Sequence, residues 1–429
     1  MRVIVLGAGV VGIATAYYLA RDGQQVTLVD RNQGAALEAS YANGGQLSYS
    51  YVAPLADPGV WTKLAPWLLS PASPVRFRPR LDPQQWRWCL QFLAACTSAR
   101  SAETTRHLLR LGHASRRLMR ELLAQQPALD FGYANSGKLV VYRDLAALNG
   151  ARRQVDFQSR SGGDPECRQQ VLDGAACVAI EPALDRIRRE IVGGVHTPSE
   201  DSADCYRFSV GLLDRIRIAS PALCCLFDTE IHRLRVRRSE IVGIETSRGL
   251  LEADAYVLAT GADSARLTRP LGLSLPIYPL KGYSLTAPIA DPGAAPTLSV
   301  TDFQRKMVYA RIDGRLRVAG IADITGYDRE VDPRRMAALV AEARALFPGA
   351  VDYRQVEGWA GLRPATPSGR PILGRAAYNK LWLNVGHGAL GFTLAAGCAQ
   401  LLADRMMGRQ PAIPDEGFLL ANAQPEGWL

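Results

Sequence analysis

The first thirty residues constrain the fold more than any other stretch of the chain. The β-branched run Arg2-Val3-Ile4-Val5-Leu6 predicts a buried strand, and it continues directly into Gly7-Ala8-Gly9-Val10-Val11-Gly12. Apolar residues at helical spacing follow, Gly23 ends that helix, and residues 26–29 rebuild a strand that stops at Asp30. A strand, a glycine-rich turn, a helix and a second strand with a terminal acid predict a βαβ dinucleotide-binding unit.

Each residue type in this unit has a physical role. Gly7 permits a tight turn, Gly9 lets the backbone approach a pyrophosphate, and Gly12 lets the helix pack closely on the sheet. The helix N-terminus offers unpaired amides to the anion. Asp30 can accept hydrogen bonds from ribose hydroxyls, and its charge disfavours a 2′-phosphate. The motif does not by itself separate FAD from NAD.

Length and cysteine usage limit the class of protein. A chain of 429 residues is long enough for two or three domains with a large core. No apolar run reaches the roughly 18 residues of a membrane span, and the first residues lack the features of a secretory signal. The eight cysteines are scattered without CxxC spacing. We therefore expect no metal site, no disulfide framework, and reduced thiols in a cytoplasmic protein.

The net charge of +9 raises the question of an anionic partner. We find no recognition helix, zinc-ligand spacing or RNP-like strand, so no nucleic-acid partner is expected. A basic face on anionic lipid, as in a protein peripheral to the inner membrane, stays open. Trp61, Trp67, Trp86 and Trp88, with basic residues between them, fit an interfacial membrane anchor or ordinary core packing. Core packing is favoured because these aromatics form no clean stripe.

Strands and helices follow one another through the rest of the chain. Helices are expected at 83–126 (two helices), 152–170, 205–217 and 333–347, and strands at 137–142, 277–286, 306–312 and 316–321. Asp313-Gly314 predicts a hairpin between the last two strands. Residues 381–385 form a strand that enters the glycine-rich stretch 386–393 before a helix that continues to Met407. This second strand-to-helix junction again favours negative charge.

Taken in chain order, these motifs resemble the amine-oxidising flavoprotein family of D-amino-acid oxidase, glycine oxidase and sarcosine oxidase, and most of all its bacterial D-amino-acid dehydrogenases. The resemblance covers essentially the whole chain. It rests on the opening GAGVVG and on four further stretches: Ala42-Asn43-Gly44-Gly45-Gln46, Pro279-Leu280-Lys281-Gly282-Tyr283-Ser284-Leu285, Gly361-Leu362-Arg363-Pro364-Ala365-Thr366-Pro367-Ser368-Gly369, and Gly386-His387-Gly388.

The resemblance implies a fold of the α/β (α+β) class with two domains whose segments alternate in sequence. A Rossmann-like FAD-binding domain is expected from residues 1–55, 165–265 and 355–410. A mixed-sheet substrate-binding domain is expected from 56–164 and 266–354, and residues 411–429 form a C-terminal tail. FAD is expected to be non-covalent, because relatives that attach flavin through a cysteine carry it in the motif that here reads Gly361-Leu362-Arg363.

Four regions are expected to contact FAD: the opening unit, the loop after it, the turn near residue 260 and the terminal junction. At His387 the backbone of the loop is the favoured contact, rather than a catalytic imidazole. The expected cofactor-binding residues are Gly7, Gly9, Val10, Val11, Gly12, Asp30, Arg31, Ser40, Ala42, Asn43, Gly45, Gln46, Ile231, Thr260, Gly261, Gly386, His387, Gly388, Gly391, Phe392 and Thr393.

Arg363 is the principal candidate for substrate binding. In the family an arginine in this motif pairs with the substrate carboxylate, and a guanidinium fork can hold a carboxylate through two parallel hydrogen bonds. Tyr283 and Tyr309 on the covering sheet, and Tyr49 and Tyr51 after the cofactor loop, are further candidates for the pocket wall.

The implied reaction is oxidation of a D-amino or D-imino acid by hydride transfer from Cα to flavin N5. The imino product is then hydrolysed to a 2-oxo acid and ammonia, and the electrons pass to a quinone or another acceptor. Two nearer alternatives are an oxidase that uses oxygen and a dehydrogenase for D-proline or hydroxy-D-proline. An alternative from another class is a nucleotide-binding redox sensor without turnover.

Overall fold

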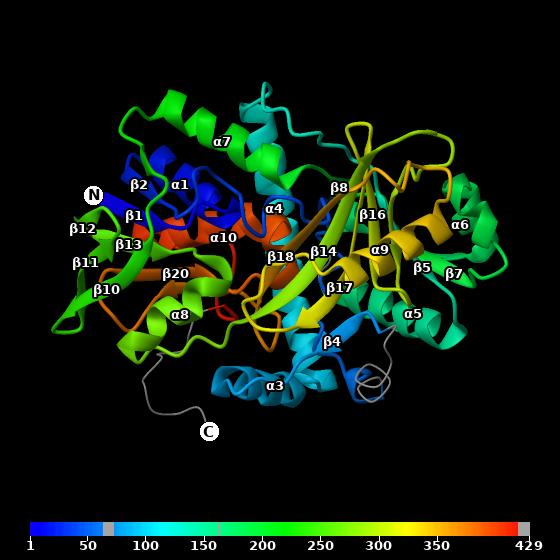
Figure 1. Ribbon diagram of the computed structural model, residues 1–429, viewed down its shortest axis with the longest axis horizontal. Helices are drawn as coiled ribbons and strands as arrows, with labels where there is room; N and C mark the ends of the chain where they lie inside the picture. Colours follow the sequence, from blue (N-terminus) through cyan, green and yellow to red (C-terminus); the bar gives the residue numbers. More distant parts are fainter. Residues whose placement is uncertain (63–72, 162–163, 419–429) are drawn as a thin grey trace.

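The computed structural model describes residues 1–62, 73–161 and 164–418, and the descriptions that follow concern these residues. Two large sheets lie side by side, with helices packed on their outer faces (Figure 1). None of the described helices is long and apolar enough to cross a membrane.

The first sheet is built around β1 (Arg2–Leu6). Its strand order is β19-β20-β13-β1-β2-β9, and all its neighbours pair in parallel except β19. The β-branched residues of β1 alternate between two cores: Val3 and Val5 face the helices, whereas Ile4 faces the opposite layer. The other strands are β2 (Gln25–Val29), β9 (Cys224–Leu226), β13 (Ala255–Leu258), β19 (Ile372–Arg375) and β20 (Leu381–Val385).

Helices cover one face of this sheet and a small sheet covers the other. The helices α1 (Val10–Arg21), α7 (Cys205–Ala219) and α10 (Gly391–Met406) share one apolar core with the strands. Below them lies a three-stranded antiparallel sheet made of β10 (Ile231–Arg237), β11 (Glu240–Thr246) and β12 (Gly249–Leu251), beside α8 (Ser264–Thr268).

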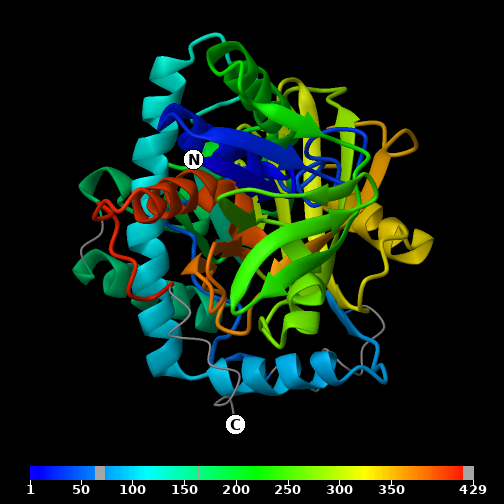
Figure 2. The same ribbon diagram turned by 90° about the vertical axis from the view of Figure 1, so that its left-hand side faces the viewer.

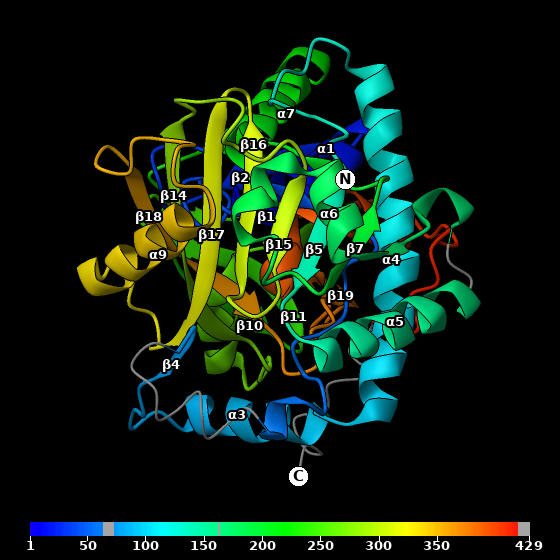
Figure 3. The same cartoon turned by 90° about the vertical axis from the view of Figure 1, so that its right-hand side faces the viewer.

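The second sheet has nine strands in the order β18-β14-β17-β16-β15-β5-β7-β6, and β4 pairs with β17. Figure 3 shows α9 (Pro333–Leu346) and α6 (Gly174–Ile180) on one face of this sheet. Asp313 and Gly314, both at positive φ, make the predicted hairpin turn between β16 and β17. The strands are β4 (Val75–Phe77), β5 (Lys138–Tyr142), β6 (Gln170–Asp173), β7 (Gly193–Thr197), β14 (Tyr278–Pro288), β15 (Ser299–Asp302), β16 (Met307–Ile312), β17 (Arg315–Ile324) and β18 (Glu357–Ala365).

Residues 83–126 form two helices, as the sequence predicts. α3 (Pro83–Ala95) is capped by Asp82, whose side chain accepts a hydrogen bond from the Gln84 amide, and α4 (Ser98–Gln125) is capped by Thr97. In Figure 2, α4 stands upright along one side of the molecule and α3 runs across its base. The polar helix expected at 152–170 is instead α5 (Leu145–Arg160), and its last expected residue already belongs to strand β6.

The two large sheets do not follow the predicted domain ranges everywhere. Strands β6, β7 and β18 hydrogen-bond in the nine-stranded sheet, although their residues fall in ranges expected for the FAD-binding domain. A two-stranded ladder of β3 (Gln46–Leu47) and β8 (Asp201–Ser202) ties the loop after β2 to a later segment of the chain. The division into an FAD-binding and a substrate-binding domain therefore stays a prediction.

Candidate active site

One large cavity of about 1030 Å³ lies between the six-stranded and nine-stranded sheets. Its volume is at the upper end of the range for ligand pockets, roughly 300–1,000 Å³. Residues from the start of α1, the end of β2, the loop 38–46, the start of α10 and one face of the nine-stranded sheet line it. Every region that the sequence predicts to contact a dinucleotide therefore contributes residues to this cavity.

One end of the cavity is the βαβ unit at the N-terminus. Gly7 has a φ of +102°, and a Cβ there would lie 2.6 Å from the carbonyl oxygen of Ala259. A Cβ on Gly12 would lie 1.9 Å from the Gly7 oxygen. Both glycines therefore allow the close approach of turn, helix and neighbouring strand that the fingerprint requires.

The Asp30 carboxylate lies at the same end, where β2 stops. Its Oδ2 accepts a hydrogen bond from the Ala8 amide at 2.7 Å, and its Oδ1 accepts two from the amide and side chain of Asn32 at 2.9 Å. Arg31 points instead to Glu38 and Asp263, at 2.5 Å and 3.0 Å. The arrangement places one carboxylate beside a helix N-terminus at which the Ser40 hydroxyl accepts a hydrogen bond from the Val10 amide at 3.0 Å, and this suits a ribose followed by a pyrophosphate.

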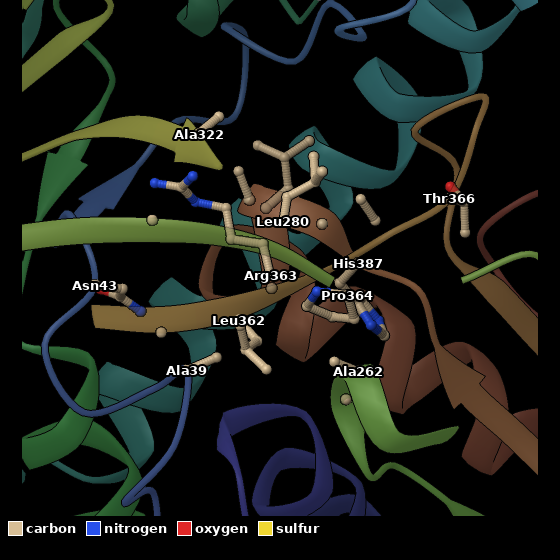
Figure 4. A pocket seen from close by; sticks show the side chains of 18 of the residues that line it. Ala39, Asn43, Ala262, Leu280, Ala322, Leu362, Arg363, Pro364, Thr366 and His387 are labelled. Atoms are coloured by element: carbon tan, nitrogen blue, oxygen red, sulfur yellow. The ribbon is translucent and has the colours of Figure 1, made fainter. Parts of the chain in front are cut away.

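Arg363 lines the cavity on the side of the nine-stranded sheet. It lies on β18 directly opposite Leu280 of β14, and its Nη1 donates a hydrogen bond to the carbonyl oxygen of Ile321 at 3.0 Å. Figure 4 shows its side chain reaching toward Ala322 and away from His387. Among the described residues, no carboxylate lies within ion-pair distance of the guanidinium.

The carboxylate nearest to Arg363 is that of Asp323, and it already accepts hydrogen bonds from other side chains. Arg76 and Arg335 donate hydrogen bonds to its carboxylate at 2.5 Å and 2.6 Å, and the Tyr283 hydroxyl donates at 3.2 Å. Burial lowers the pKa of Arg363, and Asp323 partly offsets this shift. An arginine keeps its proton in any case. Arg363 therefore lines the cavity with a guanidinium that makes no ion pair with a described carboxylate, and such a group can bind a carboxylate.

His387 lies deep in the cavity wall. Its side chain is buried, and Nε2 has no hydrogen-bond partner among the described residues. Burial lowers the pKa of the imidazole to about 3, so the ring is neutral at physiological pH. A neutral, enclosed imidazole is a poor acid for catalysis. That the loop contacts FAD through its backbone stays a prediction.

The structure brings most of the predicted site residues together around this cavity. The lining includes Arg363, Tyr51, Tyr283, Gly7, Gly9, Val10, Val11, Asp30, Arg31, Ser40, Ala42, Asn43, Gly45, Gln46, Ile231, Thr260, Gly261, His387, Gly388, Gly391, Phe392 and Thr393. Four predicted residues lie outside it: Gly12, Gly386, Tyr49 and Tyr309.

The predicted positions of the tyrosines need correction, and on the strands the reason is the alternation of side chains. Tyr309 packs against Phe347 in the core beneath α9, on the face of the sheet that turns away from the cavity. The Tyr283 ring packs in the same core, although the residue contributes to the cavity wall. Tyr49 is buried against the helices of the six-stranded sheet. Only Tyr51 of the four has its ring beside a charged group of the cavity, namely Lys138, at 4.6 Å from Nζ to the ring centroid.

The sequence did not single out Gly282 and Lys138, which both line the cavity. A Cβ on Gly282 would lie 2.2 Å from Nη2 of Arg363, so the guanidinium lies directly across this glycine. Lys138 is a lone lysine at the start of the otherwise apolar strand β5, and this pattern was an available signal.

The expected tryptophan cluster divides in two. Trp88 is buried, stacks on Phe92 with ring centroids 5.2 Å apart, and donates a hydrogen bond to the Ala365 oxygen at 2.8 Å. Trp61 and Trp86 are exposed. Core packing was therefore the correct interpretation for Trp88 and not for these two, and Trp67 and the neighbouring Lys63 lie outside the described residues.

Comparison with known proteins identifies the family. The family model described as FAD dependent oxidoreductase matches residues 2–405. The chain belongs to this family of FAD-dependent oxidoreductases. The cavity fits the cofactor, because the glycine cradle and Asp30 occupy one end and the start of α10, which has no side-chain cap, opens into it.

Relatives of this FAD-dependent oxidoreductase cover almost its whole length. It is 50% identical over 429 residues to a protein of Ralstonia nicotianae named D-amino acid dehydrogenase 2, covering 98% of this chain and 100% of that one. A protein of Pseudomonas aeruginosa with the same name is 47% identical over 423 residues, covering 97% and 98%.

Among solved structures, the crystal structure of glycine oxidase from Geobacillus kaustophilus matches with a TM-score of 0.74 at 23% identity, covering 99% of each chain. The iminodiacetate oxidase from Chelativorans matches with a TM-score of 0.71 at 24% identity, covering 97% of this chain and 98% of that one. At these identities the structural matches support the fold.

Proposed function

We propose that the protein oxidises D-amino acids at the Cα–N bond and that Arg363 holds the substrate carboxylate. The observation that carries this proposal is a guanidinium that lines the cavity and makes no ion pair with any described carboxylate. The names of relatives at 50% and 47% identity support the D-amino-acid substrate class. When bound, FAD supplies the two-electron acceptor for the Cα hydride, and the imino acid released is hydrolysed to a 2-oxo acid and ammonia.

The residues of the chain orient the substrate and exclude water. Leu280, Ala322, Ile324 and Pro364 line the cavity together with Arg363, so a carboxylate held there lies in apolar surroundings where its hydrogen bonds are strong. The carboxylates that line the described cavity, Asp30, Glu38, Glu230 and Asp263, belong to segments at or near the βαβ end. This distribution supports oxidation of a neutral amine without a carboxylate base next to Arg363.

The experiment is anaerobic reduction of the purified, FAD-loaded protein by paired D- and L-amino acids, followed in the visible spectrum. The proposal expects bleaching by the D enantiomers. Bleaching by the L enantiomers alone would refute the assignment, and selective bleaching by D-proline or hydroxy-D-proline would favour the imino-acid alternative. Bound FAD that no amino acid bleaches would favour the redox sensor. Reoxidation of the reduced protein with air or with a soluble quinone then distinguishes an oxidase from a dehydrogenase.

We also propose that the electrons leave to a quinone and that α3 contacts the inner membrane from the cytoplasmic side. Helix α3 lies between the cavity and the surface: Trp86, Trp88 and Phe92 line the cavity, and Trp86 and Leu90 are also exposed. Leu81, just before α3, is fully exposed. Exposed apolar side chains in a chain with a net charge of +9 fit an anionic lipid surface.

A further inference from the structure

Lys138 is a buried cation without an anion in contact with it. It begins β5, is 1% exposed and lines the cavity. Its Nζ donates hydrogen bonds to Oε1 of Gln46 at 2.5 Å and to Oγ of Ser48 at 3.0 Å, and it lies over the Tyr51 ring. All three partners are neutral. A buried ammonium whose contacts are all neutral is costly to fold, and the nearby Glu200 carboxylate is not in ion-pair contact with it, so a ligand in the cavity can supply a negative charge in direct contact.

The start of α10 is a second source of positive potential near Lys138. The Ser48 amide donates a hydrogen bond to Oγ1 of Thr393, in the first turn of α10, at 3.1 Å. This 16-residue helix begins without a side-chain cap, and Gly391, Phe392 and Thr393 line the cavity. The partial positive charge of the helix start therefore adds to the charge of Lys138 at one place.

An unpartnered hydroxyl lies on the neighbouring strand. Thr301 of β15 lines the cavity, is 4% exposed, and its Oγ1 has no hydrogen-bond partner among the described residues. Strand β15 pairs with β5, with Ser299 opposite Lys138. This part of the cavity thus offers an ammonium, helix amides and a free hydroxyl to a group that carries negative charge and hydrogen-bond acceptors.

The position of the site in the cavity identifies the group. The βαβ unit with Asp30 would hold the adenosine end of the dinucleotide, so the ring that takes up electrons would lie toward the nine-stranded sheet. On that sheet Arg363 of β18 and Lys138 of β5 are separated by four strands, β14, β17, β16 and β15. The space for the ring is bounded by the substrate anchor on one side and by Lys138 on the other.

We infer that Lys138, together with the start of α10, raises the reduction potential of bound FAD by holding positive charge beside the ring that accepts the electrons. Two electrons add negative charge to the ring system, and a nearby cation stabilises that reduced state relative to the oxidised one. This inference rests on FAD binding and is independent of the substrate assignment at Arg363.

Glu200 supplies an opposing charge that makes the inference testable. It is 1% exposed, its Oε1 accepts a hydrogen bond from the Ser50 amide at 2.7 Å, and its Oε2 has no partner among the described residues. Its charge interacts with that of Lys138, although the two groups are not in ion-pair contact. Further titratable groups near it are Asp201, Tyr49, Cys167 and, through Ser50, His113. Removing the Glu200 charge should therefore raise the midpoint potential of bound FAD, whereas removing the Lys138 charge should lower it.

The experiment measures the midpoint potential of bound FAD against reference dyes, under anaerobic conditions, in the FAD-loaded wild type, K138M, K138R and E200Q. We expect K138M to lower the equilibrium constant for two-electron reduction of FAD at least tenfold. For a two-electron couple this is a fall of about 30 mV in midpoint potential. K138R keeps the charge, so its equilibrium constant for reduction should stay within threefold of the wild-type value. E200Q should raise this equilibrium constant at least threefold.

The opposite signs exclude a merely structural effect, since loosening the site would move K138M and E200Q in the same direction. Shifts of the same sign, or a K138M value within twofold of the wild type, would overturn the inference. If K138M does not retain FAD, the comparison of E200Q with the wild type decides the question, and an unchanged or lowered potential in E200Q refutes it. Failure here would leave the amino-acid assignment intact, because that assignment is read from bleaching by substrates.

Discussion

The guanidinium of Arg363 lies flat across Gly282 on the neighbouring strand, so close that a Cβ at position 282 would be 2.2 Å from Nη2. The absence of a side chain at Gly282 thus determines where the charged end of Arg363 can rest. A glycine in the middle of strand β14 weakens the strand, and here it makes room for the anchor.

We expect G282A to displace the Arg363 guanidinium. Overpacking of this kind costs about 1–3 kcal/mol, so the KM for a D-amino acid should rise about tenfold while the FAD content stays unchanged. Steady-state kinetics and the visible spectrum measure the two effects. G150A in α5 is the matched control, because a Cβ there meets nothing closer than 3.9 Å. Unaltered kinetics in G282A would contradict the proposed role of the glycine.

R363L should raise KM far more steeply than it affects FAD binding. Removing one partner of a buried charge pair costs about 2–5 kcal/mol, which corresponds to a rise in KM of at least roughly thirtyfold. R315L in strand β17, which β14 separates from β18, is the control, since Arg315 pairs with Glu357 at 2.7 Å and does not line the cavity. Equal effects of the two substitutions would remove the argument for Arg363 as the substrate anchor.

The buried charges of Lys138 and Glu200 should leave a signature in the pH dependence of stability. Burial lowers the pKa of Lys138 from 10.5 to about 8 and raises that of Glu200 from 4.5 to about 7. Between pH 4.5 and 7 the folded protein keeps a proton on Glu200 that the unfolded chain has lost, so stability falls as pH rises. Between pH 8 and 10.5 the unfolded chain keeps a proton on Lys138 that the folded protein has lost, so stability rises with pH.

The contribution of this pair to the free energy of unfolding should therefore be lowest between about pH 7 and 8, with slopes of up to about 1.36 kcal/mol per pH unit on either side. The measurement is the difference in thermal midpoint between the wild type and the K138M/E200Q double variant at acidic, neutral and alkaline pH, with FAD in excess. A difference that does not change with pH would show that both groups keep their ordinary pKa values.

Membrane contact through α3 predicts that L90D weakens binding to vesicles with anionic lipids. Burying a leucine side chain contributes about 1.5–3 kcal/mol, so the loss should be at least tenfold in a vesicle co-sedimentation assay. I218D in α7 is the control, because Ile218 is 74% exposed and lies on a different helix. Binding that both variants lose equally, or that neither loses, would argue against α3 as the contact surface.

Non-covalent FAD predicts that acid precipitation releases all of the yellow colour into the supernatant. Among the described cavity residues Cys89 is the cysteine, and burial raises the pKa of its thiol, so it is not activated for attachment. Colour retained in the pellet would contradict the expectation drawn from the absence of cysteine at residues 361–363.

Local sequence was enough for the opening unit, whose strands occupy Arg2–Leu6 and Gln25–Val29, because a βαβ fingerprint contains its own partners. Arg363 was predicted to bind the substrate because of the motif in which it lies. Its neighbour Gly282 could not be inferred in the same way, because the approach of the two depends on the register between β14 and β18.

The errors on Tyr283 and Tyr309 have one physical origin. A strand sends successive side chains to opposite faces, so placing Tyr283 and Tyr309 on the correct strands did not place their rings. The register of β14 against β17 also shifts between Lys281 and Tyr283, which a residue pattern does not reveal. Strand β6 was missed because Gln170–Asp173 is short and lies at the edge of the sheet.

The order of strands in the first sheet has a consequence for synthesis on the ribosome. Strand β1 can pair early with β2, but its other neighbour is β13 at residues 255–258, and β20 at residues 381–385 completes that side. The helix that covers the start of α1, α10, emerges later still. The nascent protein must therefore hold an unfinished nucleotide-binding sheet until almost all of these residues have been translated, and this long wait favours slow folding and dependence on chaperones.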